Sequence, residues 1–265
     1  MDSVSIKPEV VKLEAHDIHL PAVCQVDALR PFTWLRMGWH DFASTWYTSL
    51  GFGLLFVLLG WGLVNWAWEL NHLSLTLTTG FMLVSPFLAL VFYYLSRCLD
   101  QHHRPGDGSR FFHLLEHNGA SIGIYAVFLM FSLSVWERLS AILVALFLQG
   151  DFIGGDYFSL MDLFTSAQWG FVTAYVVTGE VVALVFALSV VSLPMMLDRR
   201  VDTVTAMMTS LKAARANPGA MIIWAGLIAG LVAVGFATWF AGLVILFPVL
   251  GHATWHAYRE LVQKN

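Results

Sequence analysis

Long apolar runs recur along the chain, and they limit it to one broad class of fold. A run such as Gly219 to Trp239 exceeds the roughly 18 residues that a helix needs to cross the hydrocarbon core of a bilayer. Only 12% of the 265 residues are charged, about half the share found in soluble domains. The sequence therefore predicts an all-α, polytopic membrane protein, and its net charge of −4 favours no nucleic-acid partner.

The chain divides into a short tail and one membrane domain. Residues 1–25 mix charged and apolar residues and lack the apolar core of a signal peptide, so we expect a cytoplasmic tail. Residues 26–265 are expected to form a single domain, which begins with an interfacial amphipathic helix over 26–42. We predict six transmembrane helices, over about 44–66, 79–94, 119–136, 168–193, 219–239 and 242–258.

The end of the third transmembrane helix can be placed in two ways. Glu137 and Arg138 interrupt an apolar stretch that ends at Leu148. Because a charge pair at the centre of a bilayer is costly, we expect the helix to end near Trp136 and residues 139–149 to lie in the outer interface. A single long, tilted helix that continues through this segment is the alternative.

Lys and Arg residues predict the orientation of the chain. They gather before the first expected helix, between the second and third, between the fourth and fifth, and after the sixth. The intervening segments carry none, apart from Arg138 at a helix edge. By the positive-inside rule, both termini are cytoplasmic, in agreement with an even number of membrane helices.

The chain also contains a weak internal repeat. Units of interfacial helix plus transmembrane hairpin are predicted over about 26–97, 109–200 and 201–259, packed around a pseudo-threefold centre. Chance similarity between apolar helices is the rival explanation. One polar residue precedes a membrane helix in each unit, as a helix N-cap would, and these residues are Asp41, Asn118 and Asn217.

Three stretches of the chain carry a family resemblance. The segment from Ser192 to Asp202, the turn at 217–219, and the segment from Phe247 to Arg259 resemble a family of predicted bacterial integral membrane proteins of unknown function. The resemblance covers most of the chain and is most specific near the C-terminus. It implies a bacterial inner-membrane protein and no established activity. Some family members are labelled cytochrome c oxidase subunit I, although that subunit has many more membrane helices and more histidines at helix depth.

Glu180 and His252 are the polar residues that the predicted helices place deepest in the membrane. An ionisable group at this depth costs roughly 3 kcal/mol or more and by default marks a functional site. Both residues fall at a similar distance from the outer ends of their helices, so we hypothesise that they pair. The pair would be a proton-relay element, a ligand pair, or a hydrogen bond that fixes helix packing.

His252 and His256 stand four residues apart and share one helix face. Histidine is a common ligand of zinc, copper and haem iron, so the two residues are candidate metal ligands and haem or a metal is a candidate cofactor. Two histidines on one helix are a weak metal signal, and hydrogen bonds to neighbouring helices are the favoured interpretation.

Three classes of function remain open. The first is a non-catalytic accessory or scaffold protein of a membrane complex, such as a respiratory one, because no catalytic motif is evident and the loops are too short for a cytoplasmic active site. The second is a small transporter or channel, with Glu180 and His252 lining a path. The third is a haem- or metal-binding membrane protein that uses His252 and His256. The expected partners are the lipid bilayer and, in the first class, another membrane protein complex.

Overall fold

The structure is a computed structural model that describes residues 20–69, 85–103, 108–147, 179–180 and 182–263. These residues fold almost entirely into helices, which confirms the all-α class. The named helices are α1 Arg30–Ser44, α2 Trp46–Glu69, α4 Leu90–Asp100, α5 Gly108–Phe147, α7 Ser192–Asp198, α8 Thr203–Ala216, α9 Pro218–Ala237 and α10 Leu243–Leu261.

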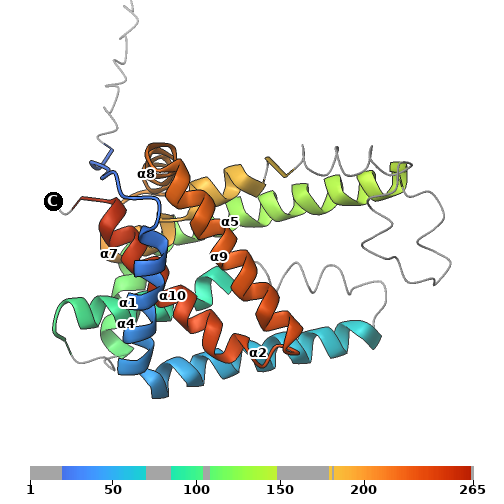
Figure 1. Ribbon diagram of the computed structural model, residues 1–265, viewed down its shortest axis with the longest axis horizontal. Coiled ribbons are helices and arrows are strands. Elements are labelled where there is room, and N and C mark those ends of the chain that lie inside the picture. The colour runs from blue at the N-terminus through green and yellow to red at the C-terminus, as the bar shows by residue number, and fades with distance from the viewer. Residues whose placement is uncertain (1–19, 70–84, 104–107, 148–178, 181, 264–265) are drawn as a thin grey trace, which may run out of the picture.

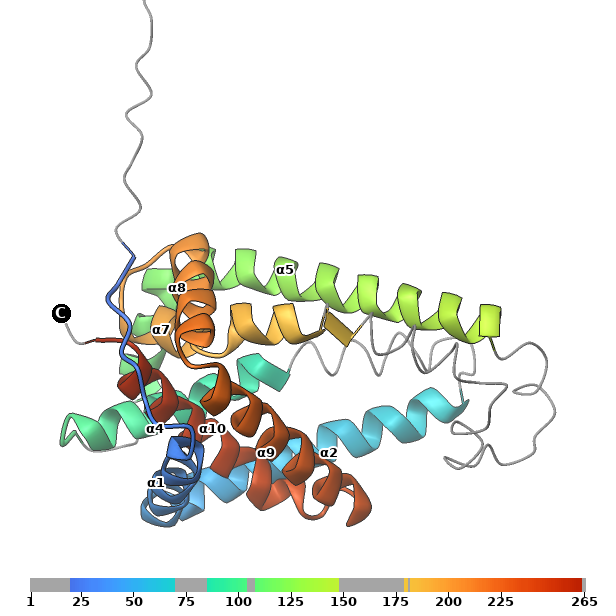
Figure 2. The same ribbon diagram turned by 45° about the horizontal axis from the view of Figure 1, so that its top comes forward.

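The short helices gather at one end of the molecule, and the long apolar helices run from there to the other end (Figure 1). The helices α1, α4, α7 and α8 lie close to the C-terminus, whereas α2 and α5 extend away on opposite sides (Figure 2). Helix α10 lies between these groups and contacts α1, α2, α4, α7 and α9. It is therefore the central packing element of the fold.

Three helices of the described part of the chain are long and apolar enough to cross a membrane. They support a protein that crosses the membrane several times. The predicted second and fourth helices lie partly outside the described residues. The predicted number of six and the threefold repeat stay predictions. The three candidate spans are Trp46–Leu63, Gly108–Leu143 and Pro218–Ala237, and a shorter apolar helix covers Val182–Asp198.

The expected end of the third membrane helix is wrong, and the alternative of one long helix is confirmed. Helix α5 continues for 40 residues, with a kink at Asn118. No Gly or Pro interrupts residues 124–147, so nothing in the backbone ends the helix near Trp136. At 1.5 Å per residue, Glu137 lies roughly 28 Å beyond the kink, which is about the thickness of a bilayer core. A membrane segment that begins at the kink would therefore place the charge pair near the far interface, where its cost is small.

The three polar residues expected as helix caps instead join separate segments. Asp41 lies inside α1, and Asn118 donates hydrogen bonds to carbonyl groups near the end of α7. Asn217 stands at the N-cap of α9, but its side chain does not cap that helix. Its amide accepts a hydrogen bond from Val26 N at 2.8 Å and donates to Cys24 O at 3.0 Å, which anchors the N-terminal segment.

Candidate functional site

A close approach of two helices brings α1 against α10. A Cβ atom added at Gly38 would lie 2.6 Å from Ala253 N and 2.7 Å from Val249 O, so only glycine allows this approach. Asp41 and His256 follow Gly38 and Ala253 by three residues and lie on the same faces of their helices. The small residues therefore bring the carboxyl group and the imidazole ring together.

Asp41 accepts hydrogen bonds from two other helices. Its Oδ2 atom lies 2.7 Å from His256 Nε2 of α10 and 2.6 Å from Ser96 Oγ of α4. Only 7% of the surface of Asp41 is exposed. Burial by itself raises the pKa of Asp41, but the hydrogen bonds from His256 and Ser96 outweigh this effect and leave the pKa below its usual value. Asp41 is thus held as a buried carboxylate.

His252 is fully buried, and both of its ring nitrogens are hydrogen-bonded to serine hydroxyls. Nδ1 lies 2.8 Å from Ser96 Oγ, and Nε2 lies 3.0 Å from Ser49 Oγ. Because Ser96 donates its single proton to the carboxylate of Asp41, His252 Nδ1 must donate to Ser96. In a neutral ring Nε2 then accepts the proton of Ser49, which makes His252 the Nδ1–H tautomer.

Helix α2 supplies the other wall of this site. Ser49 of α2 is fully buried, Thr45 just before α2 is nearly so, and their hydroxyls lie 2.9 Å apart. One turn further on, a Cβ atom at Gly53 would lie 2.1 Å from Val244 O of α10. This contact holds α2 close enough to α10 for Ser49 to reach His252. We call Asp41, Ser49, Ser96, His252 and His256 the polar junction.

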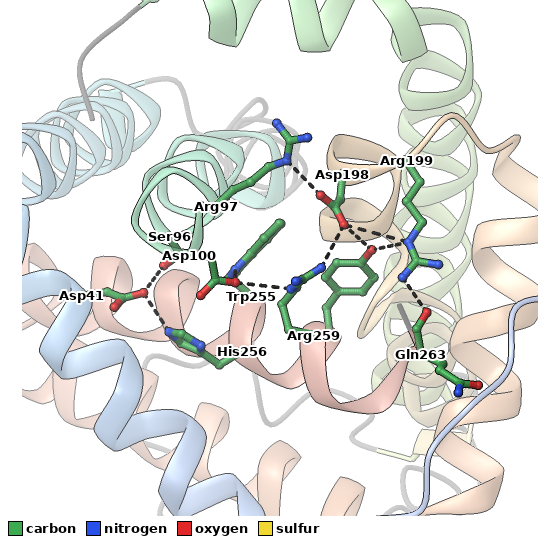
Figure 3. A network of polar contacts seen from close by, with 11 residues as sticks. Asp41, Ser96, Arg97, Asp100, Asp198, Arg199, Trp255, His256, Arg259 and Gln263 are labelled. Atoms are coloured by element: carbon green, nitrogen blue, oxygen red, sulfur yellow. Dashed lines mark hydrogen bonds and ion pairs between the residues drawn. The ribbon is translucent and has the colours of Figure 1, made fainter. Parts of the chain in front are cut away.

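A second group of charged residues lies one turn further along α10 and forms the arginine cluster (Figure 3). Asp198 at the end of α7 accepts hydrogen bonds from Arg97 Nε and from Tyr258 Oη, both at 2.8 Å. Arg259 lies 3.4 Å from Asp198 and 3.3 Å from Asp100. The cluster consists of Arg97, Asp100, Asp198, Arg199, Tyr258 and Arg259.

Three of the basic residues that predict the orientation of the chain also form ion pairs within the arginine cluster. Arg97, Arg199 and Arg259 point towards Asp198 and are largely buried, whereas Arg200 is exposed. These three side chains join α4, α7 and α10 as well as marking the expected cytoplasmic side. Buried charges of this kind are stable only when they are paired.

The structure does not bring the predicted pair of Glu180 and His252 together. Glu180 is exposed and precedes the helix Val182–Asp198, whereas the hydrogen-bond partners of His252 are Ser49 and Ser96. A functional role for Glu180 stays a prediction. His252 is therefore linked to a carboxylate other than Glu180: its partner Ser96 donates a hydrogen bond to Asp41.

The two candidate metal ligands lie in the polar junction, but they do not converge on one point. His252 uses both ring nitrogens for serines, and His256 Nε2 is taken by Asp41. Within the described ranges, no group of three or more His, Cys, Asp or Glu side chains could hold a metal ion. Metal or haem binding at these residues stays a prediction, and the observed geometry favours the hydrogen-bonded interpretation.

Asp41, Ser49 and Ser96 are the members of the polar junction that sequence reasoning missed. One signal was available, because Trp34, Gly38 and Asp41 recur at helical spacing on the buried face of α1. A carboxylate on the apolar face of an amphipathic helix indicates a buried partner. Ser49 and Ser96 gave no signal, since small hydroxyl residues are common in membrane helices.

The helical fold and its apolar spans define an integral membrane protein with several membrane-spanning helices. Residues 73–198 match the family described as "Predicted integral membrane protein (DUF2189)". This match confirms the family that the sequence resembles, but not the extent of the resemblance towards the C-terminus. It ends at Asp198, before the polar end of α10, and it does not support the cytochrome c oxidase label. No curated protein and no solved structure matches the chain.

Proposed function

We propose that the chain is a small proton-coupled membrane transporter that uses the polar junction as its proton-binding element. Its membrane would be the bacterial inner membrane, with both termini in the cytoplasm. The observation that carries the proposal is the unbroken series of hydrogen bonds from His256 through Asp41, Ser96 and His252 to Ser49. Ionisable groups buried in a membrane protein typically mark ion pathways and proton relays.

The polar junction has one end at the surface and one end in the core. His40 is mostly exposed, and its Nδ1 atom lies 3.9 Å from Asp41 Oδ1. At the other end, Leu250 and Gly251 directly precede His252 and line a partly open cavity of about 430 Å³. A proton taken up near His40 could reach His252 by transfer through Asp41 and Ser96. This arrangement would couple proton binding to events in the cavity.

We expect Ser96→Ala to abolish proton movement, because the Ser96 hydroxyl contacts both Asp41 and His252. The protein is reconstituted into phospholipid vesicles that contain a pH-sensitive dye, and a potassium gradient with valinomycin sets the membrane potential. The internal pH of vesicles that contain the wild-type protein should change several-fold faster than that of empty vesicles. The variant should match empty vesicles.

Ser192→Ala is the matched control for this measurement. Ser192 is as fully buried as Ser96, but its hydroxyl donates to Leu188 O in the preceding turn. This variant should keep the wild-type rate. Wild-type vesicles that behave like empty ones at both signs of the potential, or a Ser96→Ala protein that behaves like wild type, would refute proton coupling through the polar junction.

An accessory role within a membrane complex is the second candidate, and α9 supports it. Gly226 and Gly230 form a small-residue face with Ala229 and Ala233 beside them. All four residues are exposed, and a Cβ atom added at either glycine would meet nothing within 4 Å. The face does not serve packing among the described residues, so it is free to contact a helix of another membrane protein.

Leucine at positions 226 and 230 should release such a partner, because the larger side chains would hold the two helices apart. We expect a stoichiometric membrane partner to co-purify with the tagged wild-type chain in mild detergent and to be lost from the Gly226→Leu/Gly230→Leu variant. Ala237→Leu, on the exposed end of the same helix, should retain it. Identical co-purification with all three proteins would exclude this face as the contact.

A further inference from the structure

The arginine cluster carries more positive than negative charge. It contains the guanidinium groups of Arg97, Arg199 and Arg259. Their carboxylate partners among the described residues are Asp198 and Asp100 alone. One positive charge of the cluster is therefore not compensated within the described part of the chain. Because charges shielded from water are usually paired, an anion from outside the chain would complete the cluster.

Arg97 presents two unused donors at the edge of this cluster. Its Nε atom donates to Asp198 Oδ1, and its two terminal amino groups have no hydrogen-bond partner among the described residues. Figure 3 shows these amino groups pointing away from Asp198. The side chain is 17% exposed, and neither amino group is among the buried atoms that lack a partner. An incoming anion can therefore reach both groups, in contrast to Nη1 of Arg199, which is buried.

The geometry of these donors suits a phosphate group. The two terminal amino groups of one guanidinium can donate parallel hydrogen bonds to two phosphate oxygens. Asp198 already fixes the Nε atom of Arg97, so the plane of the guanidinium is held before an anion arrives. Little side-chain freedom remains to be lost on binding, which favours affinity. Arg259 is bound to the other oxygen of Asp198 and adds a second positive charge nearby.

The surroundings of Arg97 indicate that the phosphate belongs to a lipid. The cluster lies at the end of the molecule from which the long apolar helices extend (Figure 1). One turn before Arg97, the ring of Tyr94 contacts Phe111 near the start of α5, with 5.2 Å between the ring centroids. The next residue, Phe112, is 63% exposed. Exposed aromatic side chains beside basic residues are typical of the membrane interface, where acyl chains cover the rings and head groups meet the charges.

We propose that the arginine cluster binds the phosphate group of an anionic phospholipid, with Arg97 as the main contact. The uncompensated positive charge repels the ammonium group of a zwitterionic lipid and favours a head group with a net negative charge, such as phosphatidylglycerol. This inference does not rest on the proposed proton transport, because lipid binding is measured without proton movement. The vesicle experiment and the binding experiment can therefore fail independently.

Binding is measured with tagged, full-length protein in mild detergent by a scintillation proximity assay. The probe is tritium-labelled dioctanoylphosphatidylglycerol, and the competitors are the unlabelled lipid, dioctanoylphosphatidylcholine and sodium phosphate. We expect saturable binding that phosphatidylcholine displaces several-fold less effectively than phosphatidylglycerol does. Sodium phosphate at the same concentrations should displace none of the probe, because it has no acyl chains to bind beside Phe112. Arg97→Gln should lower the affinity roughly 5-fold, the usual contribution of one basic residue at a membrane surface.

Arg215→Gln is the matched control, since Arg215 is an exposed arginine of α8 outside the cluster. This variant should bind as tightly as wild type. If Arg97→Gln does not elute as a folded protein, Arg97→Lys replaces it. Lysine keeps the charge but has a single ammonium group, so the affinity should fall about 2- to 3-fold.

Four results would overturn the inference. The probe does not bind saturably, phosphatidylcholine competes as well as phosphatidylglycerol, or the folded Arg97 variant binds as tightly as Arg215→Gln. In the fourth, sodium phosphate displaces the probe as well as the unlabelled lipid does, which would assign the site to free phosphate instead of a lipid.

Discussion

Replacing Gly53 by alanine should destabilise the protein more than any other single methyl group added to α2. The new Cβ atom would lie 2.1 Å from Val244 O and 2.9 Å from Pro248 Cγ, so the backbones of α2 and α10 would have to separate. Overpacking of this kind costs about 1–3 kcal/mol, and we expect about 3 kcal/mol because the closest atom is backbone. The separation would also draw Ser49 away from His252.

The measurement is thermal unfolding in detergent, followed by intrinsic fluorescence. For a chain of this size the expected loss lowers the unfolding temperature by roughly 6–12 °C. Gly51→Ala on the same helix is the control, because a Cβ atom there meets nothing within 4 Å. Alanine is intrinsically better than glycine in a helix by about 1 kcal/mol, so this variant should melt slightly higher. Equal shifts in both variants would contradict the close approach of α2 and α10.

Asp41→Asn should produce the second large effect, through the loss of a buried carboxylate that two helices stabilise. Asp41 Oδ2 accepts hydrogen bonds from both His256 and Ser96. Removing one partner of a buried pair typically costs about 3–5 kcal/mol, because the remaining polar groups are left without compensation. Thermal unfolding should show a loss at the lower end of this range. Asp202→Asn is the control, since Asp202 is exposed and Asn caps helices as well as Asp does.

Acid should remove the same contribution from the wild-type protein. The pKa of Asp41 in the folded state lies below its usual value, mainly because hydrogen bonds from His256 and Ser96 outweigh the effect of burial. The stabilisation is therefore fully present above the unfolded pKa of roughly 3.9 and is lost as the pH falls towards the lower, folded value. The stability difference between wild type and Asp41→Asn should narrow below about pH 4. A constant difference over this range would show that the charge of Asp41 does not stabilise the fold.

Local pattern predicted much of the helical framework. The amphipathic segment expected over 26–42 corresponds to α1, and the expected fifth and sixth membrane helices correspond to α9 and α10 within a few residues. The bounds of these helices could be predicted because apolar length and helical periodicity are properties of a single segment. The membrane-spanning role of α10 stays a prediction. The end of α5 could not be predicted in this way, because the depth of Glu137 depends on where the helix enters the membrane, which the local pattern does not specify.

The candidate site could be predicted only in part. His252 and His256 were recognisable from their spacing on one helix. Their partners were not, because 203 residues separate Ser49 from His252 and 215 separate Asp41 from His256. The choice of Glu180 as a partner relied on estimated depth, and depth alone leaves open which helices are neighbours.

The amino-acid sequence alone thus determined the class of the protein and the position of many of its helices. Apolar length and backbone hydrogen bonds within each segment decide whether a helix can reside in a membrane. The tertiary structure alone decided which polar groups meet. Gly38 and Gly53 allow α1 and α2 to approach α10 so closely that short side chains can form hydrogen bonds between helices. That approach depends on how the helices pack against one another, which no single segment specifies.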